Sequence, residues 1–411
     1  TTLHDVQDYI LKNMDNGYAT GVLFLDLKKT FDTVNHDILI KKLKHYGVDN
    51  RELLWFKSYL ANRFQTVNVN STLSDFQPIN IGIPQGSILG PLLFIIFVNC
   101  LPCAVDECKT VMYADDTSLM YKAKNVSDLQ NQLESCLNKV ADWFKANKLT
   151  LNVDKTKFMI FGTNRTLDKF HDVQLTFNDN IIERVDEFKY LGVKLDSNLS
   201  WSAHIDYLCK NVSKRTGIIK RMKYFLPRQT IVMLSNALVI PHFDYGSTVW
   251  SNFSTEFHNK LQVLHNNLAR IILSADIRTP INEMMDALEW VKLDKRWHDQ
   301  LLLIVFKCLR KLSPSYLSSQ FEFVHDSHSH LTRSHTSNTL AVPKFNSNSG
   351  LRTFHVRAAY AWNNLPSTVR TEMINMSVNQ LSQKFTKFNL FCSSCTYLRN
   401  FHHTVIISIA L

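Results

Sequence analysis

The sequence predicts an α+β domain followed by a helical region. Short strand-like segments are mixed with helical ones up to about residue 196, and such a mixture is typical of α+β domains. After about residue 200 the hydrophobic periodicity becomes helical. A long amphipathic helix in the first part is predicted by apolar residues at spacings of four, four, three and four, namely Leu129, Leu133, Leu137, Val140 and Phe144.

The first part begins with a short apolar run, Val22 to Leu25, that ends at Asp26. A continuous apolar run of this length predicts a strand buried on both faces. Helical spacing follows from Asn35 to Gly47, and a second helical stretch covers residues 53–60.

Residues 76–81 predict a second short strand that leads into a tight loop at 82–86 and an apolar helix from about Ser87. Residues 110–120 predict a hairpin with two carboxylates, Asp115 and Asp116, at its tip.

Ser127 and Gln130 have the spacing of a capping box for the amphipathic helix that follows them. Strand-like segments return at 158–161 and 188–195.

A basic amphipathic helix is predicted around Lys210 to Lys223, with Pro227 as its end. On a helical wheel Lys210, Lys214 and Arg221 fall within roughly 40° of one another. The apolar residues on the opposite side are Leu208, Val212, Ile219 and Met222.

Positive charge is concentrated in the second half of the chain. Residues 1–200 contain 22 Lys and Arg and 24 Asp and Glu, a net charge of −2. Residues 201–411 contain the other 24 Lys and Arg and only 12 Asp and Glu, a net charge of +12. This asymmetry favours a polyanionic partner. The longest apolar run, residues 91–98, is far below the ~20 residues of a membrane-spanning helix, so no membrane partner is expected.

The eight cysteines are scattered, which suits a reducing compartment better than a disulfide framework. Cys100, Cys103 and Cys108 are interpreted as packing residues. The chain opens on Thr1 without a signal peptide, so a fragment is expected.

Three carboxylates are candidate metal ligands. Asp26 ends a buried strand, and Asp115 and Asp116 occupy a hairpin tip. An unpartnered buried carboxylate is costly, and hard oxygen ligands suit Mg²⁺. If each feature is considered alone, a helix or turn cap explains Asp26 better than metal binding does. Likewise, a solvated turn explains the pair of Asp115 and Asp116 better than metal binding does.

Four motifs occur in order: residues 24–36 (FLDLKKTFDTVNH), 82–91 (GIPQGSILGP), 113–116 (YADD) and 151–156 (LNVDKT). Together they resemble the reverse transcriptase of non-LTR (LINE-type) retrotransposons of the Jockey-like group. The resemblance covers residues 1–280 and, more loosely, the remainder. It implies a right-hand polymerase fold with an antiparallel palm sheet and packed helices.

The resemblance implies three regions: a palm with partial fingers at 1–199, a helical thumb at 200–280 and a basic C-terminal region at 281–411. It implies RNA-directed DNA polymerase activity on an RNA template and a DNA primer with dNTPs. Asp26 and Asp115 are then the main ligands of two Mg²⁺ ions, or Mn²⁺ in their place, with Asp116 beside them.

The resemblance also implies substrate contacts. Phe31 blocks the ribose 2′-hydroxyl, although core packing is the better interpretation without the motif. Gln85 and Gly86 pack against the incoming nucleotide, and Lys155 lies near its triphosphate unless it is a solvated surface lysine. The hairpin at Tyr190, Leu191 and Gly192 grips the primer end, and the basic face with Lys210, Lys214 and Arg221 follows the phosphates.

Asp32 is interpreted as structural, with a role in capping the following helix, and His36 has no catalytic role. Two groups of Cys and His residues are weaker candidates for metal binding. The first is better interpreted as part of an apolar tail and the second as a polar loop. They are Cys392 and Cys395 with His402 and His403, and the tract His325, His328, His330 and His335. No function is derived for residues 352–366.

The family's upstream fingers and N-terminal endonuclease are absent from this chain. An alternative is therefore a catalytically silent relic that only binds RNA or DNA. A viral RNA-directed RNA polymerase is disfavoured by Phe31, Gln85 and Gly86. The family implies action in the nucleus, with assembly in the cytoplasm. The sequence does not give the oligomeric state.

Overall fold

The computed structural model describes the chain except residues 179, 253, 328–337, 378–379 and 381–411. It divides into two compact units, one of residues 17–186 and one of residues 3–16 together with those from Glu187 onward. The predicted functional boundaries at 199 and 280 remain predictions. In the described chain no helix is both long enough and apolar enough to cross a lipid bilayer.

The unit of residues 17–186 is built on a six-stranded sheet of order β6-β7-β1-β8-β10-β9. Its pairs are antiparallel except for β8 with β10. The elements are β1 Ala19–Leu25, α2 His36–His45, α3 Asn50–Leu60, β2 Arg63–Gln65, β3 Asn68–Val69, β4 Thr72–Leu73, β5 Gln77–Ile79, α4 Leu89–Val98, β6 Lys109–Tyr113, β7 Asp116–Ala123, α5 Val126–Asn147, β8 Lys157–Phe161, α6 Asn164–Leu167, β9 Leu175–Phe177 and β10 Asn180–Arg184.

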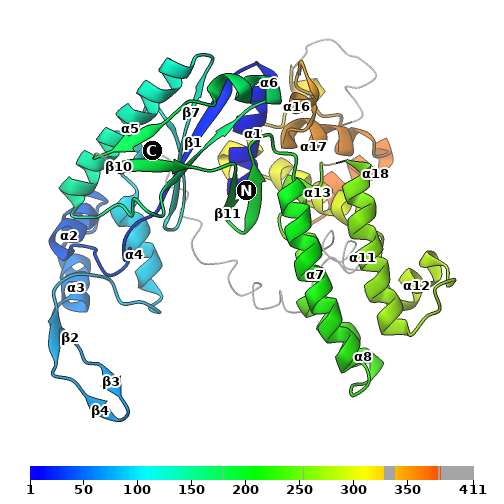
Figure 1. Cartoon of the computed structure of the whole chain (residues 1–411), viewed down its shortest axis with the longest axis horizontal. Helices are drawn as coiled ribbons and strands as arrows, with labels where there is room; N and C mark the ends of the chain where they lie inside the picture. The colour runs from blue at the N-terminus through cyan, green and yellow to red at the C-terminus, as the bar shows by residue number, and fades with distance from the viewer. Residues whose placement is uncertain (179, 253, 328–337, 378–379, 381–411) are drawn as a thin grey trace. The chain divides into compact units, whose positions relative to one another are not determined.

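The amphipathic helix α5 lies along this sheet (Figure 1). Its predicted apolar residues, from Leu129 to Phe144, are all buried. Gly21 allows α5 to approach β1 closely, because a Cβ at this position would lie 2.6 Å from the Cδ1 of Leu133. The predicted mixture of strands and helices is thus confirmed.

The predicted capping box of α5 is wrong. The helix begins at Val126 with Asn125 as its N-cap, and no side chain bonds to the cap. Ser127 therefore lies inside the first turn, and Gln130 bonds to Glu134 instead of reaching back (Nε2 to Oε1, 3.4 Å).

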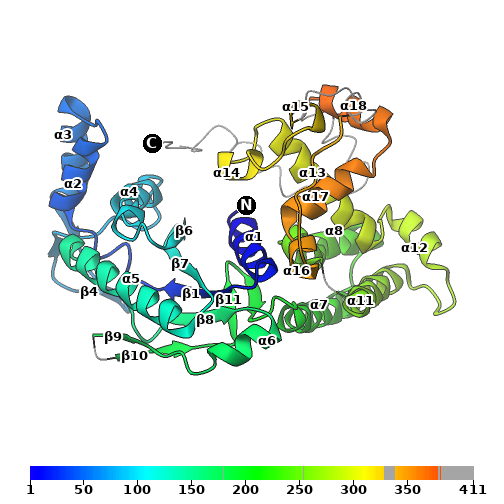
Figure 2. The ribbon, with the colours of Figure 1, turned by 90° about the horizontal axis from the view of Figure 1, so that it is seen from above.

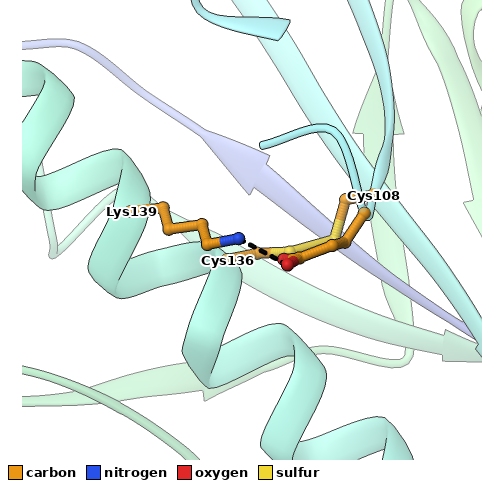
Figure 3. Close-up of a disulfide and its surroundings, with 4 residues drawn as sticks. Cys108, Cys136 and Lys139 are labelled. Atoms are coloured by element: carbon orange, nitrogen blue, oxygen red, sulfur yellow. Dashed lines mark ion pairs between the residues drawn. A yellow bond between two sulfur atoms is a disulfide. The ribbon is translucent and has the colours of Figure 1, made fainter. Parts of the chain in front are cut away.

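Cys108 and Cys136 form a disulfide between the loop before β6 and helix α5 (Figure 3). Both cysteines are buried, and Lys139 and Glu107 form an ion pair of 2.5 Å beside them. Cys108 packs in the core as expected. The expectation of reduced cysteines is wrong for this pair, because the fold brings together two residues 28 positions apart. Cys100, Cys103, Cys209 and Cys308 are free.

Among its described residues, the second unit is helical apart from one hairpin and a short bridge, and this confirms the helical periodicity after residue 200. Its elements are α1 Thr2–Asp15, β11 Glu187–Tyr190, β12 Val193–Asp196, α7 Ser202–Met222, α8 Arg228–Leu238, α9 Ile240–Asp244, α10 Ser247–Trp250, α11 Thr255–Leu273, α12 Ile281–Leu288, α13 Leu293–Leu309, α14 Ser315–Ser318, α15 Val324–Ser327, α16 Asn348–Leu351, α17 Phe354–Asn363 and α18 Ser367–Asn375. The predicted end of α7 is wrong, because α7 ends at Met222 and Pro227 is instead the N-cap of α8.

Residues near the C-terminal end of the described chain hold α1 in place. The Asp15 carboxylate accepts hydrogen bonds from the backbone N–H and the hydroxyl of Ser347 (2.6 and 2.7 Å). Asp8 accepts a bond from the Phe354 N–H (2.6 Å), and the Phe354 ring lies 4.3 Å from that of His4. The segment 352–366, which had no derived function, thus has a structural role.

Candidate active site

Asp26 lies at the end of the central strand of the sheet. Every residue of β1 is buried, and the strand pairs with β7 on one side and β8 on the other. Leu25 is the partner of Thr117 across the β1–β7 pair. Continuing this register by one residue sets Asp26 opposite Asp116.

Asp115 and Asp116 lie at the tip of the β6–β7 hairpin, as predicted. Tyr113 pairs with Asp116, so Ala114 and Asp115 form a two-residue turn. Ala114 has a φ of +54°, a left-handed conformation that costs free energy for a residue with a Cβ and is concentrated at functional sites. Both aspartates are exposed to solvent.

The three carboxylates influence one another electrostatically. Partial desolvation, followed by the negative charges of Asp115 and Asp26, raises the pKa of the Asp116 carboxyl. A like charge nearby disfavours the ionised form. Ionisation of all three groups is therefore opposed unless a cation offsets it.

Asn152 and Thr156 hold Asp26 from the loop before β8. The Asn152 side-chain amide donates to Asp26 Oδ2 (2.9 Å), and the Asn152 backbone N–H donates to the Asp26 carbonyl (2.8 Å). The Asp26 N–H donates to the Thr156 hydroxyl (3.3 Å), which donates to the Asn152 carbonyl (2.9 Å). The motif at residues 151–156 contains both Asn152 and Thr156, but the family resemblance assigns a role only to Lys155.

The donor set suits a hard divalent cation. Carboxylate oxygens are the ligands that Mg²⁺ prefers, and the mutual repulsion at Asp116 is what a bound cation relieves. In the described chain, however, no three His, Cys, Asp or Glu side chains are grouped as a ready-made metal site. The aspartates are thus neighbours that lack a closed coordination shell.

The loop at 82–86 is fastened to the segment after Asp26. The N–H groups of Gly82 and Ile83 donate to the carbonyls of Val34 and Phe31 (both 2.7 Å). Gly82 has a φ of +90°, and a Cβ there would lie 2.9 Å from the Asp32 carbonyl oxygen. Only glycine suits this close approach in this conformation.

Gln85 and Asp32 join the same two segments through their side chains, since Gln85 Nε2 donates to Asp32 Oδ1 (2.9 Å). The interpretation of Asp32 as a helix cap is wrong, because Asn35 caps α2 by accepting from the Ile38 N–H (3.1 Å). His36 bonds to the Gly82 carbonyl (2.7 Å).

Phe31 is half-buried, and its ring centroid lies 5.3 Å from that of Phe94 in α4. Phe31 therefore packs in the core, as predicted without the motif, and part of its side chain is still exposed to solvent. Gln85, Gly86 and Lys155 are exposed.

In the second unit, the turn between β11 and β12 contains Leu191 and Gly192, both with positive φ (+45° and +82°), as a two-residue hairpin turn requires. The Tyr245 hydroxyl donates to the Leu191 carbonyl (2.7 Å) and fixes the turn. Tyr190 is buried, so its side chain supports the hairpin from within.

Helix α7 has the predicted division into two faces. Lys210, Lys214 and Arg221 are all exposed. Leu208, Val212 and Ile219 are buried. The basic row is thus free of the core, as an amphipathic helix requires.

Comparison with known proteins identifies the family. The family model for "Reverse transcriptase (RNA-dependent DNA polymerase)" matches residues 2–195. The probable RNA-directed DNA polymerase from transposon BS of Drosophila melanogaster is 30% identical over 289 residues, which are 66% of this chain and 31% of that protein. The matched part of the chain belongs to the reverse transcriptases of Jockey-like non-LTR retrotransposons.

A second relative of the chain is the RNA-directed DNA polymerase from mobile element jockey of Drosophila melanogaster, 31% identical over 66% of this chain and 30% of that protein. The chain spans about three-tenths of the length of these relatives. The chain also matches a solved structure of telomerase from Candida albicans, with 13% sequence identity and a TM-score of 0.34. This match covers 72% of this chain and 52% of the telomerase chain.

The family match contains Asp26, Asp115, Asp116 and the loops around them. The basic row of α7 lies beyond the matched residues. His325 lies beside Asp326 (3.4 Å) and stacks on Phe323. The other members of its tract, His328, His330 and His335, and the group Cys392, Cys395, His402 and His403 lie outside the described residues.

Proposed function

We propose that this reverse transcriptase domain is an RNA-directed DNA polymerase that extends a DNA primer on an RNA template. The observation that carries the proposal is the convergence of Asp26 with Asp115 and Asp116 at the adjoining ends of β1 and β7, where partial desolvation and the charges of Asp115 and Asp26 raise the pKa of Asp116. Because the chain covers only about three-tenths of the length of its relatives, the activity is proposed for this domain rather than transferred from them.

Asp26 and Asp115 are the proposed principal metal ligands, with Asp116 beside them. These carboxylates would hold two Mg²⁺ ions, or Mn²⁺ in their place, which would supply activation of the primer 3′-hydroxyl and stabilisation of the leaving pyrophosphate. The protein's own part is to hold Asp26 through Asn152 and to present Asp115 at the hairpin turn.

The proposed nucleotide contacts come from Phe31, Gln85, Gly86 and Lys155. The Phe31 ring is anchored against Phe94, so its exposed part is a rigid wall that excludes a ribose 2′-hydroxyl. The exposed Lys155 ammonium is available to offset charge on the triphosphate. Gly86, with a φ of +79° and no neighbour within 4 Å of a Cβ position, leaves its backbone open to a ligand.

The proposed palm with partial fingers is 1–199, the thumb 200–280 and the basic C-terminal region 281–411. Tyr190, Leu191 and Gly192 are the proposed primer grip, and the row of Lys210, Lys214 and Arg221 the proposed phosphate contacts. Such contacts are independent of sequence and sensitive to salt. The nucleus is the proposed place of action.

Primer extension on an RNA template with dNTPs and Mg²⁺ tests the proposal. We expect extension that Asp115→Asn abolishes and that Asp106→Asn, a change at another exposed aspartate of the same unit, leaves intact. Salt-sensitive binding of RNA or DNA without any extension supports the silent relic instead. Extension that survives Asp115→Asn contradicts the assigned site.

A further inference from the structure

Two adjacent aromatic side chains are exposed at the turn between α7 and α8. Tyr224 is 75% exposed and Phe225 is 85% exposed. The turn lies at the end of α7 where α8 begins (Figure 1). Large apolar side chains that are exposed side by side commonly mark an interaction site.

The turn is strongly basic. From Tyr207 to Phe243 the sequence has seven Lys and Arg residues and no Asp or Glu. Lys223 directly precedes the aromatic pair, and Lys220 lies four residues before Tyr224. The Lys223 ammonium lies 5.4 Å from the ring centroid of Tyr224. The charge of the turn therefore complements a polyanion.

A cavity of about 530 Å³ adjoins the turn, between α7 and α11, which lie side by side (Figures 1 and 2). In this described part of the chain its lining contains two cations, Lys223 and Arg270, and no acidic residue. Two lining residues, Thr216 and Arg270, each have a buried polar atom, Oγ1 and Nε, with no hydrogen-bond partner within the described protein. The other Arg270 nitrogens make only long bonds, to the Asn267 side chain (3.3 Å) and the Ile277 carbonyl (3.5 Å). Buried polar groups normally have partners.

Lys223 caps the C-terminal end of α11, but this role explains only part of the basic and aromatic character of the turn. The Lys223 ammonium reaches the Ile271 carbonyl and the Ser274 hydroxyl near the end of α11, but both distances are long, at 3.4 Å. Such bonds leave the ammonium able to donate to a stronger acceptor. Capping also gives no reason for the exposure of Tyr224 and Phe225.

We propose that this turn and the adjoining cavity form a binding site for single-stranded nucleic acid. Unpaired bases stack on Tyr224 and Phe225, and phosphates are bound by Lys220, Lys223 and Arg270. A duplex does not fit this role, because its base faces are already stacked, whereas every unpaired base offers a free π-face. This inference rests on the proposed function in one respect, namely the choice of nucleic acid as the ligand.

The site is separate from the row of Lys210, Lys214 and Arg221. Lys223 follows Arg221 by two residues, which is about 200° around a helix, and it lines the cavity beside α11. The row therefore suits a duplex backbone, and the turn suits an unpaired strand next to it.

Fluorescence anisotropy with the full chain tests the aromatic part. The probes are a labelled single-stranded RNA, a single-stranded DNA of the same sequence and their duplex. We expect Tyr224→Ala with Phe225→Ala to weaken binding of the single strands about tenfold or more, since each stacking ring contributes substantially, and to change duplex binding less than twofold. Tyr360→Ala is the matched control, because Tyr360 is another exposed aromatic of the same unit.

Unchanged single-strand affinity, or an equal loss for single strands and duplex, overturns the proposal. A loss confined to RNA or to DNA identifies which strand the site holds. Asp115→Asn separates the two proposals, because it should abolish extension and leave single-strand binding intact.

Salt dependence tests the cationic part. Lys223→Ala and Lys220→Ala should each reduce the slope of log affinity against log salt concentration by about one for single strands. Lys220 is exposed, so its variant keeps the test valid if loss of the Lys223 cap disturbs α11. Lys292→Ala is the control, and slopes identical to it in both variants contradict the phosphate contacts.

Discussion

The side-chain amide of Asn152 donates a 2.9 Å hydrogen bond to the carboxylate of Asp26, a residue 126 positions earlier in the sequence. The same two residues are also joined through their backbones. Two such links fix the Asp26 side chain at the end of β1. The bond occupies one carboxylate oxygen and leaves the other for a cation, so Asn152 is a positioning residue for the proposed metal site.

Asn152→Ala should therefore raise the Mg²⁺ concentration needed for half-maximal primer extension by about tenfold or more, the usual cost of removing an outer-shell partner. The rate at saturating Mg²⁺ should change less, because the Asp26 carboxylate remains. A Mg²⁺ titration of extension measures both quantities.

Asn99→Ala, which alters an exposed amide of the same unit, is the control for Asn152→Ala. If the variant lost rate at every Mg²⁺ concentration with an unchanged half-saturation point, Asn152 would not act through the metal site.

Asp116→Asn should stabilise the fold while it weakens metal binding. The charges of Asp115 and Asp26 help to raise the pKa of Asp116 in the folded state, so its ionised form costs stability at neutral pH. Because the shift is upward, this cost disappears as the pH falls through the raised pKa. We expect a melting temperature about 1–2 °C higher at pH 7.5 without Mg²⁺, and no gain at acidic pH. A variant that melts lower at pH 7.5 contradicts the repulsion.

Phe31→Ala should increase incorporation of ribonucleotides relative to deoxyribonucleotides by about tenfold, because it removes a steric wall beside the ribose. Competition of rNTP with dNTP in single-nucleotide extension measures the ratio. The ring also packs on Phe94, so Phe31→Tyr, which keeps that contact, serves as the control and should retain selectivity. Equal selectivity in the alanine and tyrosine variants removes Phe31 from its role.

Local patterns predicted the parts of the fold that depend on neighbours in sequence. The spacing of apolar residues found α5, and the buried run before Asp26 found β1. The ordered motifs predicted the meeting of Asp26 with Asp115 and Asp116, because the family resemblance carries tertiary information that periodicity lacks.

Long-range contacts were not accessible to the same reasoning. The bond between Asp15 and Ser347 joins residues 332 positions apart, and the Cys108–Cys136 disulfide depends on where α5 lies against the sheet. Ser127 and Asp32 failed as predicted caps because neighbouring asparagines, Asn125 and Asn35, occupy the N-cap positions. A capping signature one or more residues out of register is indistinguishable in sequence from a true one.

Reduction of the Cys108–Cys136 disulfide should destabilise the sheet unit. Closing a loop with a separation of 28 residues stabilises a fold by about 3–4 kcal/mol in the chain-entropy account. We expect a reductant to lower the melting temperature of the wild type and to leave that of Cys136→Ala unchanged. Cys103→Ser, at an exposed free cysteine, should behave like the wild type. Alkylation of Cys108 without prior reduction contradicts the bond.

The helical unit should lose stability in mild acid because of its buried histidines. Burial lowers the pKa of His265 to about 3 and the pKa of His204 to about 4, against about 6.5 in an unfolded chain. Both are therefore neutral in the folded state, and protonation favours unfolding. Stability is fully present above about pH 6.5 and is lost as the pH falls toward the folded values.

At pH 5 each of these two histidines should cost about 2 kcal/mol relative to pH 7.5. Denaturant unfolding followed by tryptophan fluorescence measures the loss, since Trp290 stacks on His265 with centroids 5.1 Å apart. His265→Phe keeps an aromatic ring in that stack and cannot be protonated, so its stability should fall by about 2 kcal/mol less between the two pH values. A pH dependence identical to that of the wild type would mean that His265 is already charged in the folded protein, which its burial against Trp290 and beside Arg296 opposes.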